Sequence, residues 1–279
     1  MMRNERGKNK MKIGNRIFDF EQKAYIMGIL NVTPDSFSDG GKFNRFDEGL
    51  RQAEQLIQDG ADILDIGGES TRPGYTFLSA QEELERVLPM IEAIKQRFDI
   101  PISLDTYKSE VAKEGIKAGV DLINDIWGLR WDGSMAEVVA KSNIPVCIMH
   151  NRKEQNYQNF LSDVLDDLRE SIKIAKEAGI RDEHIILDPG IGFAKSLEQN
   201  LYLMNHMEAL LELSYPVLLG TSRKSMIGLT LNLPVDEREE GTIVTTVLGY
   251  EKGCRIFRVH DVKKNKRALE MLEAIVKAK

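Results

Sequence analysis

The stretch AYIMGILN, residues 24–31, decides the fold, because it is the first of eight apolar runs built on one plan. Each run has the length of a strand and leads into polar residues, and stretches of helical period separate the runs. The eight runs are Ala24–Leu30, Asp62–Ile66, Pro101–Leu104, Val120–Ile123, Ile144–Met149, His184–Leu187, Tyr215–Leu219 and Arg255–Phe257. Strand then helix, eight times, predicts an α/β fold, a single (β/α)8 TIM barrel with its chemistry at the strands' carboxyl ends.

The bulk composition fits one such barrel and excludes several other classes of protein. The chain has 279 residues, and a barrel of this kind needs about 250. Its net charge of −6, with a basic stretch only at residues 1–10, argues against a nucleic-acid partner. The apolar runs fall well short of the roughly 20 residues that span a bilayer, and no signal peptide is recognisable. We therefore expect a cytoplasmic protein without a membrane partner.

The domain plan is a disordered extension, residues 1–10, followed by one catalytic barrel, residues 11–279. Met11–Phe20, with a Gly14-Asn15 turn, predicts a β-hairpin that closes the bottom of the barrel. Cys147 and Cys254 fall in or beside strands and are interpreted as core residues. Three helices are expected to bury one apolar face each. These faces are Val87, Ile91, Ile94 and Phe98; Val164, Leu168, Ile172 and Ala175; and Leu269, Leu272, Ile275 and Val276.

The loop after the first strand, NVTPDSFSDGG (residues 31–41), carries more polar groups than a chain reversal needs. It is either a solvated turn or a mobile lid with oxygen ligands for a hard cation. Magnesium takes one or two protein oxygens and leaves the remaining positions to phosphate and water. Asn31 and Asp35 are the candidate Mg²⁺ ligands, and Mg²⁺ is the expected cofactor.

Three polar side chains end the third, fourth and sixth strands. Asp105, Asn124 and Asp188 would each be an ordinary helix cap if taken alone. Together at one barrel mouth they match the donor edge of a 2-amino-pyrimidinone ring, since carboxylates accept hydrogen bonds from neighbouring N–H groups. A planar ligand is therefore expected, with its faces sandwiched by nearby apolar side chains. These are Ile126, Met149 and Phe193.

A basic cluster follows the last two strands, where barrels of this class usually bind phosphate. Lys224 comes after the seventh strand, and Arg258 and His260 end the eighth on one side of the chain. These three are assigned to an anion. Arg223 is left open between a surface charge and the same site, and His150 is also left open.

Seven motifs together resemble the dihydropteroate synthase family, from about residue 12 to the end. They are NVTPDSFSDGG (31–41), DIGGESTRPG (65–74), SLDTY (103–107), NDI (124–126), DPGIGFAKS (188–196), GTSRKS (220–225) and RVHDV (258–262). The resemblance implies condensation of 6-hydroxymethyl-7,8-dihydropterin pyrophosphate with 4-aminobenzoate. The products would be 7,8-dihydropteroate and pyrophosphate, in a step of folate biosynthesis that sulfonamides block.

The resemblance also implies roles for individual residues. Asp105, Asn124, Asp188 and Lys224 would hold the pterin, and Asn31, Arg258 and His260 would hold the pyrophosphate with magnesium. The 4-aminobenzoate would lie near Thr71, Arg72, Pro73, Phe193, Lys224 and Ser225. Asp105, Lys224, Arg258 and His260 are the expected catalytic residues. A homodimer formed through late barrel helices is implied as well.

Two other functions remain possible on this scaffold. A pterin-binding methyltransferase domain would keep the pterin pocket but would have no use for the basic and first-loop residues. A non-catalytic pterin-binding paralogue should have lost some of them. Both alternatives are disfavoured by Thr71-Arg72-Pro73 and Ser222-Arg223-Lys224.

Overall fold

The computed structural model describes residues 10–32, 42–69 and 77–278. Within these residues, eight parallel strands form one sheet in the order β8-β7-β6-β5-β4-β3-β10-β9. A bridge between Leu187 and Val217 joins the two outermost strands and closes the ring. The predicted TIM barrel is thereby confirmed. Its strands are β3 (Tyr25–Asn31), β4 (Ile63–Gly67), β5 (Ile102–Asp105), β6 (Leu122–Asp125), β7 (Val146–Met149), β8 (Ile185–Asp188), β9 (Leu218–Leu219) and β10 (Ile256–Val259).

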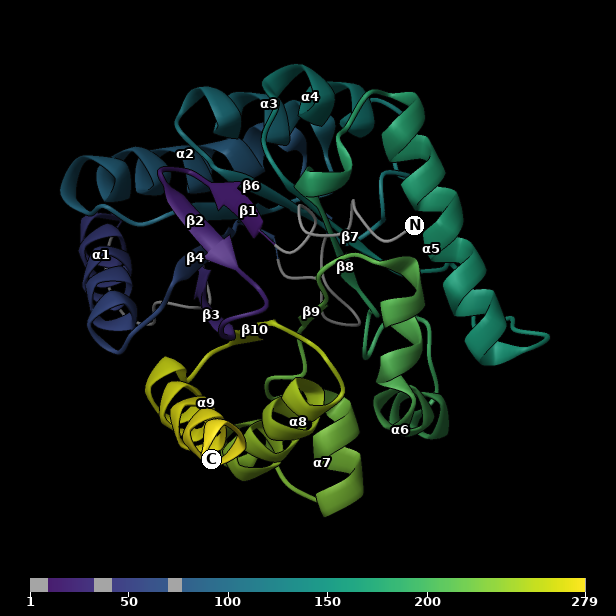
Figure 1. Cartoon of the computed structure of the whole chain (residues 1–279). Coiled ribbons are helices and arrows are strands. Elements are labelled where there is room, and N and C mark those ends of the chain that lie inside the picture. Colours follow the sequence, from purple (N-terminus) through teal and green to yellow (C-terminus); the bar gives the residue numbers. More distant parts are fainter. Residues whose placement is uncertain (1–9, 33–41, 70–76, 279) are drawn as a thin grey trace.

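Helices surround the barrel, as Figure 1 shows. In the described part of the chain they are α1 (Lys42–Gln58), α2 (Ala80–Arg97), α3 (Ser109–Lys117), α4 (Met135–Ser142), α5 (Phe160–Glu177), α6 (Leu197–Asn205), α7 (Ser225–Leu231), α8 (Glu239–Glu251) and α9 (Val262–Lys277). None of these helices is long and apolar enough to cross a membrane.

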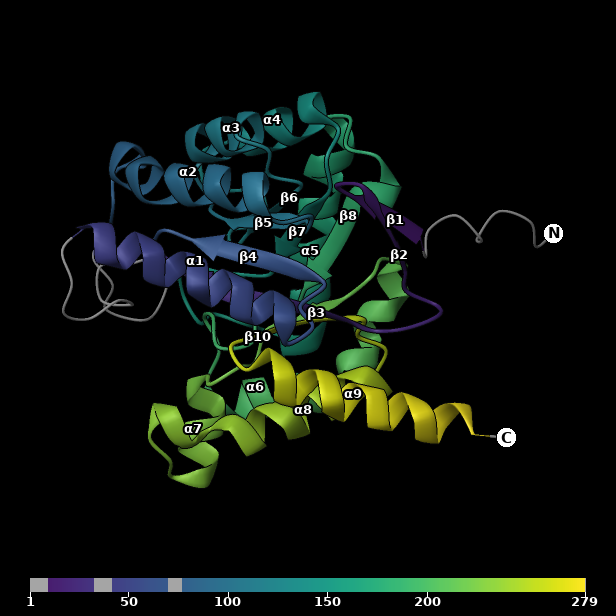
Figure 2. The same ribbon diagram turned by 90° about the vertical axis from the view of Figure 1, so that its left-hand side faces the viewer.

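The predicted hairpin is present as β1 (Lys10–Ile13) paired antiparallel with β2 (Arg16–Asp19). Its buried side chains pack against the amino ends of the barrel strands. The hairpin contributes Met11, Ile13 and Phe18 to this cluster, and the strands contribute residues such as Ile63, Leu122, Cys147, Ile186 and Leu218. Figure 2 shows the hairpin at one end of the barrel, so the bottom is closed and the chemistry is left to the opposite end.

The predicted face of α5 is confirmed, and those of α2 and α9 are confirmed in part, since Phe98 follows the end of α2 and is half-buried. Val87, Ile91 and Ile94 of α2 are fully buried, and the predicted face of α5 is buried as well. On α9, Leu269 is buried but Ile275 and Val276 are 60% and 55% exposed. The expectation for these last two residues was wrong, since apolar periodicity alone does not show where a helix leaves the core.

Candidate active site

Polar side chains gather at the carboxyl ends of neighbouring strands. Asp105 and Asn124 are directly paired in the β5–β6 register, and Met149 is paired with Asp188 in the β7–β8 register. The sheet therefore places the three predicted ring-binding residues on one rim of the barrel, because parallel strands end at the same edge. Asn124 is almost fully buried, as is Asp188.

Arg258 reaches across this rim and joins two carboxylates. Its Nε lies 2.5 Å from Asp65 Oδ2, and its Nη2 lies 2.7 Å from Asp105 Oδ2. Asn124 Nδ2 approaches the same Asp65 oxygen at 3.5 Å. Asp65 is fully buried within β4 and was not among the predicted site residues. Its signal was a charged residue inside an otherwise apolar run, which implies a buried cationic partner.

Asp188 and Arg258 face the same space. A Cβ atom placed on Gly220 would lie 3.8 Å from Asp188 Oδ2 and 3.9 Å from Arg258 Cβ. A similar test at Gly67 finds Asp105 Oδ2 at 3.7 Å and Asn31 Oδ1 at 3.8 Å. Glycine at these two strand ends leaves the rim open beside the acidic and basic groups.

Lys224, at the start of α7, adds another cation to the charged groups of the rim. Its Nζ donates to the carbonyl of Ile191 and lies 4.7 Å from the centre of the Phe193 ring. Burial lowers the pKa of Lys224 to about 8, and Asp188 acts in the opposite direction. The ammonium is therefore held by the Ile191 carbonyl and the Phe193 ring, and it interacts electrostatically with the Asp188 carboxylate.

Burial also raises the pKa values of the carboxyl groups on this rim. The pKa of Asp105 is raised to about 7, because burial and the nearby Asp65 outweigh the Arg258 charge. The pKa of Asp188 is raised by burial, against Lys224 and a hydrogen bond from the Gly190 amide. Asp105 Oδ1 is buried without a hydrogen-bond partner among the described residues. Such an acceptor is costly unless a ligand satisfies it.

An apolar wall stands beside these groups. Ile126 and Met149 pack with Tyr107, and Phe193 packs against this cluster. The three side chains predicted to sandwich a planar ligand thus lie together, next to the carboxylates.

The remaining predicted residues lie around the rim or outside the described part. His260 Nδ1 is 2.9 Å from Ser222 Oγ, which links the ends of β10 and β9. Ser225 is exposed at the start of α7. Asp35, Thr71, Arg72 and Pro73 lie outside the described residues, as do residues 1–9 of the predicted extension.

The two residues left open both contact other side chains of the protein. His150 is buried between Asp167 and Lys195, at 2.9 and 2.8 Å. Arg223 has a left-handed backbone at φ 58°, and its Nε lies 4.0 Å from Glu239 of α8. In the described part of the chain, neither side chain hydrogen-bonds to the carboxylate and amide groups predicted to bind the ring, so neither is assigned to the pterin.

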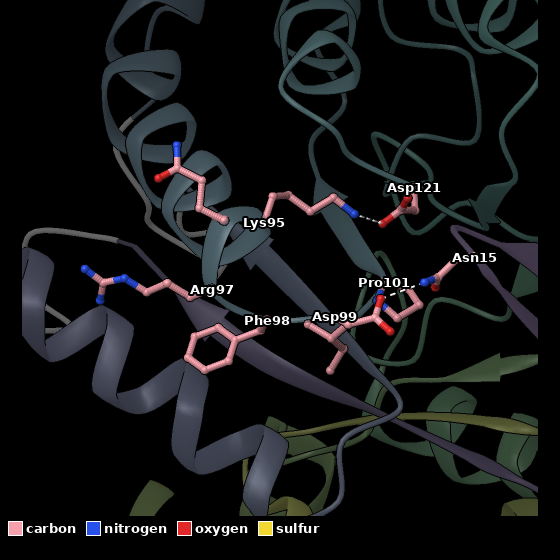
Figure 3. A pocket seen from close by; sticks show the side chains of 9 residues that line it. Asn15, Lys95, Arg97, Phe98, Asp99, Pro101 and Asp121 are labelled. Carbon is pink, nitrogen blue, oxygen red and sulfur yellow. Dashed lines mark hydrogen bonds and ion pairs between the residues drawn. The ribbon is translucent and has the colours of Figure 1, made fainter.

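A surface hollow elsewhere does not compete with this rim. Figure 3 shows it beside the end of α2 and the start of β5, at the opposite end of the barrel from Asp105. Lys95 is paired with Asp121 at 2.7 Å, and Asn15 donates to Asp99 at 2.7 Å. These four side chains thus satisfy one another, whereas the rim keeps a buried acceptor, Asp105 Oδ1, without a partner among the described residues.

Comparison with known proteins agrees with this geometry. Residues 27–260 match the family described as pterin binding enzyme. A curated dihydropteroate synthase of Clostridium beijerinckii is 59% identical over 268 residues, covering 96% of this chain and all of the relative. The structure of a dihydropteroate synthase from Clostridium difficile, solved with pteroic acid, has a TM-score of 0.92 at 51% identity and covers 94% of this chain and 100% of that one. The Xanthomonas albilineans enzyme with 4-aminobenzoic acid has a TM-score of 0.93 at 38% identity, covering 98% and 100%.

Proposed function

The chain belongs to the dihydropteroate synthase family of pterin-binding enzymes, and we propose that it condenses 6-hydroxymethyl-7,8-dihydropterin pyrophosphate with 4-aminobenzoate. The products are 7,8-dihydropteroate and pyrophosphate. Curated relatives of 59% and 55% identity are dihydropteroate synthases, which favours this activity over a methyltransferase domain or a non-catalytic paralogue.

One observation carries the assignment of the pterin site. Buried acceptors of Asp105, Asn124 and Asp188 share the rim with an apolar wall, and Asp105 Oδ1 has no partner among the described residues. The N–H groups of a pterin ring satisfy such acceptors, while Met149 and Phe193 cover its faces. Lys224 donates to the pterin carbonyl and orients the ring.

The pyrophosphate lies toward Arg258 and His260. A guanidinium has five N–H donors, and the contacts with Asp65 and Asp105 leave several of these free for phosphate oxygens. When the C–O bond breaks, its electron pair leaves with the pyrophosphate, and these cations stabilise the developing charge. Asp105, if ionised, stabilises the methylene cation that remains. The amine of 4-aminobenzoate then attacks the methylene carbon and loses its proton to solvent.

Magnesium is proposed as the cofactor, with Asn31 and Asp35 as its protein ligands. Asn31 ends β3, and a Cβ atom placed on Gly67 would lie 3.8 Å from Asn31 Oδ1 and 3.7 Å from Asp105 Oδ2, so this amide oxygen lies on the same rim as the carboxylate. A single amide oxygen with one carboxylate fits a cation that takes its other ligands from phosphate and water. When bound, Mg²⁺ would neutralise charge on the pyrophosphate. The 4-aminobenzoate is assigned to Thr71, Arg72, Pro73, Phe193 and Ser225, the site where sulfonamides would compete.

A product assay tests the function directly. The purified protein is mixed with the pterin pyrophosphate, radiolabelled 4-aminobenzoate and Mg²⁺, and labelled dihydropteroate is expected. Omitting the pterin substrate is the control. Absence of labelled product, with protein that is folded by circular dichroism, would rule out the proposed reaction.

We also propose a homodimer formed through the late helices. Leu229 of α7 and Val244 of α8 are 67% and 65% exposed, so these two late helices present aliphatic side chains to solvent that a partner subunit could cover. Replacing Val244 by glutamate is expected to shift the sedimentation mass from dimer to monomer, because a charge would be buried at the contact. Ile17→Glu, at a 62% exposed residue of the hairpin, is the matched control. A dimer unaffected by Val244→Glu would place the contact elsewhere.

The cytoplasmic location stays a prediction.

A further inference from the structure

Lys195 is a buried amine that the proposed reaction leaves unused. It is 6% exposed and lies just before α6. Its Nζ is 2.9 Å from the Gly190 carbonyl, 3.0 Å from the Phe193 carbonyl and 2.8 Å from His150 Nδ1. Three acceptors therefore surround one amine, which matches the three donors of an ammonium group.

The partners of His150 determine which of its two ring nitrogens carries the proton. His150 Nε2 lies 2.9 Å from Asp167 Oδ2, and Arg152 Nε donates to the same carboxylate oxygen at 2.5 Å. Nε2 must then carry the proton, since a bare ring nitrogen would face a carboxylate. Nδ1 is left as an acceptor, and Lys195 is the donor that it faces among the described residues.

The titration behaviour is compatible with this arrangement. Burial lowers the pKa of His150 to about 4, so the ring is neutral near pH 7. Burial lowers the pKa of Lys195 to about 7, while Asp188 raises it and the nearby Lys224 lowers it further. The charged form is held by the three acceptors rather than by solvent.

The turn that Lys195 contacts includes Phe193 and accepts a hydrogen bond from Lys224, two residues assigned to substrate binding. Gly190 has φ 68°, and a Cβ there would overlap the His150 carbonyl, so the turn packs closely on β7. Between the two carbonyls bound by Lys195 lies Ile191, whose carbonyl accepts from Lys224. Phe193 itself lies against Lys224. Two lysines thus donate hydrogen bonds to three carbonyls of one turn.

From these contacts we infer that Lys195 is a positioning residue, which acts with His150 and Asp167 to hold the Gly190–Phe193 turn so that Phe193 and Lys224 meet the substrates. This inference rests on the proposed function for its substrates, whereas the contacts of Lys195 with the turn do not depend on that function.

Lys195→Met tests the inference, because methionine keeps the length of the side chain and removes every donor. The KM for 4-aminobenzoate is expected to rise about tenfold with kcat nearly unchanged, as when only a tenth of the molecules hold the turn in place. Lys173→Met, at an exposed lysine of α5, is the control and should leave KM unchanged. A merely structural lysine would lower the melting temperature and the active fraction but leave KM unchanged, and that result would overturn the inference.

Two substitutions of His150 test whether its contact with Lys195 helps to hold the turn. His150→Asn keeps an acceptor where Nδ1 contacts Lys195, whereas His150→Gln keeps a donor toward Asp167 and loses that acceptor. The glutamine variant is expected to raise KM as Lys195→Met does, and the asparagine variant should raise it less. Equal or reversed effects would show that the contact with Lys195 is not the one that matters.

Hydrogen exchange separates this inference from the proposed function. The peptide covering residues 188–196 should exchange faster in Lys195→Met than in Lys173→Met, whether or not the wild-type protein makes dihydropteroate. Unchanged exchange in this peptide would refute the statement that Lys195 holds the turn. An inactive wild-type protein would refute only the proposed reaction.

Discussion

Replacing Arg258 by methionine is expected to lower the free energy of unfolding by about 3–5 kcal/mol near pH 8, the usual effect of removing one partner from a buried ion pair. Asp65 and Asp105 would both lose their cation, and Asp65 is fully buried. Urea unfolding followed by circular dichroism measures this change. The same variant should also bind the pyrophosphate-bearing substrate less tightly, so stability must be measured beside affinity.

The loss should depend on pH in a fixed direction. The pKa of Asp105 is already raised to about 7 by burial, and Arg258 is the main group that lowers it, so its removal raises that pKa further. A folded-state pKa above the ordinary value means that the folded protein binds the proton more tightly. The free energy of unfolding therefore falls as the pH rises from the ordinary pKa of an aspartate toward the raised pKa of Asp105 in the folded protein. The deficit should therefore be smaller near about pH 5 than near about pH 8.

Arg267→Met, at an exposed residue of α9, is the control and should change stability little. A deficit for Arg258→Met that is small, or that is equal at both pH values, would contradict the placement of this arginine between two buried carboxylates.

Asp188→Asn is expected to weaken pterin binding by roughly 2–4 kcal/mol, since the ring N–H groups would lose a charged acceptor and meet an amide. The fold should survive, because asparagine Oδ1 can still accept from the Gly190 amide, now 2.7 Å from Asp188 Oδ1. Calorimetric titration with 6-hydroxymethylpterin measures the change.

Asp166→Asn provides a matched control for this titration. Asp166 is exposed on α5, where it pairs with Arg169 and accepts a hydrogen bond from Ser162. If both variants bound the pterin as tightly as wild type, Asp188 would have no part in recognising the ring.

Sequence patterns predicted the barrel because its strands are buried on both faces and read as short apolar runs. The hairpin was predicted equally well by its Gly14-Asn15 turn. The exposed end of α9 was not, since Ile275 and Val276 continue an apolar period beyond the core. The strand β9 is only two residues long, shorter than the apolar run that predicted it.

The site was predicted where single residues end strands, and missed where partners come from distant elements. Asp105, Asn124 and Asp188 could be placed because parallel strands end together. The pairing of Asp65 with Arg258 joins residues 193 positions apart, and sequence spacing cannot show it. The same holds for His150, whose contacts come from α5 and from the turn after β8.

A crystal structure with bound 6-hydroxymethylpterin pyrophosphate tests the central claim most directly. The account predicts the ring among Asp105, Asn124 and Asp188, with its pyrophosphate toward Arg258 and His260. A ring bound at the opposite end of the barrel, such as the hollow beside Lys95 in Figure 3, would contradict it.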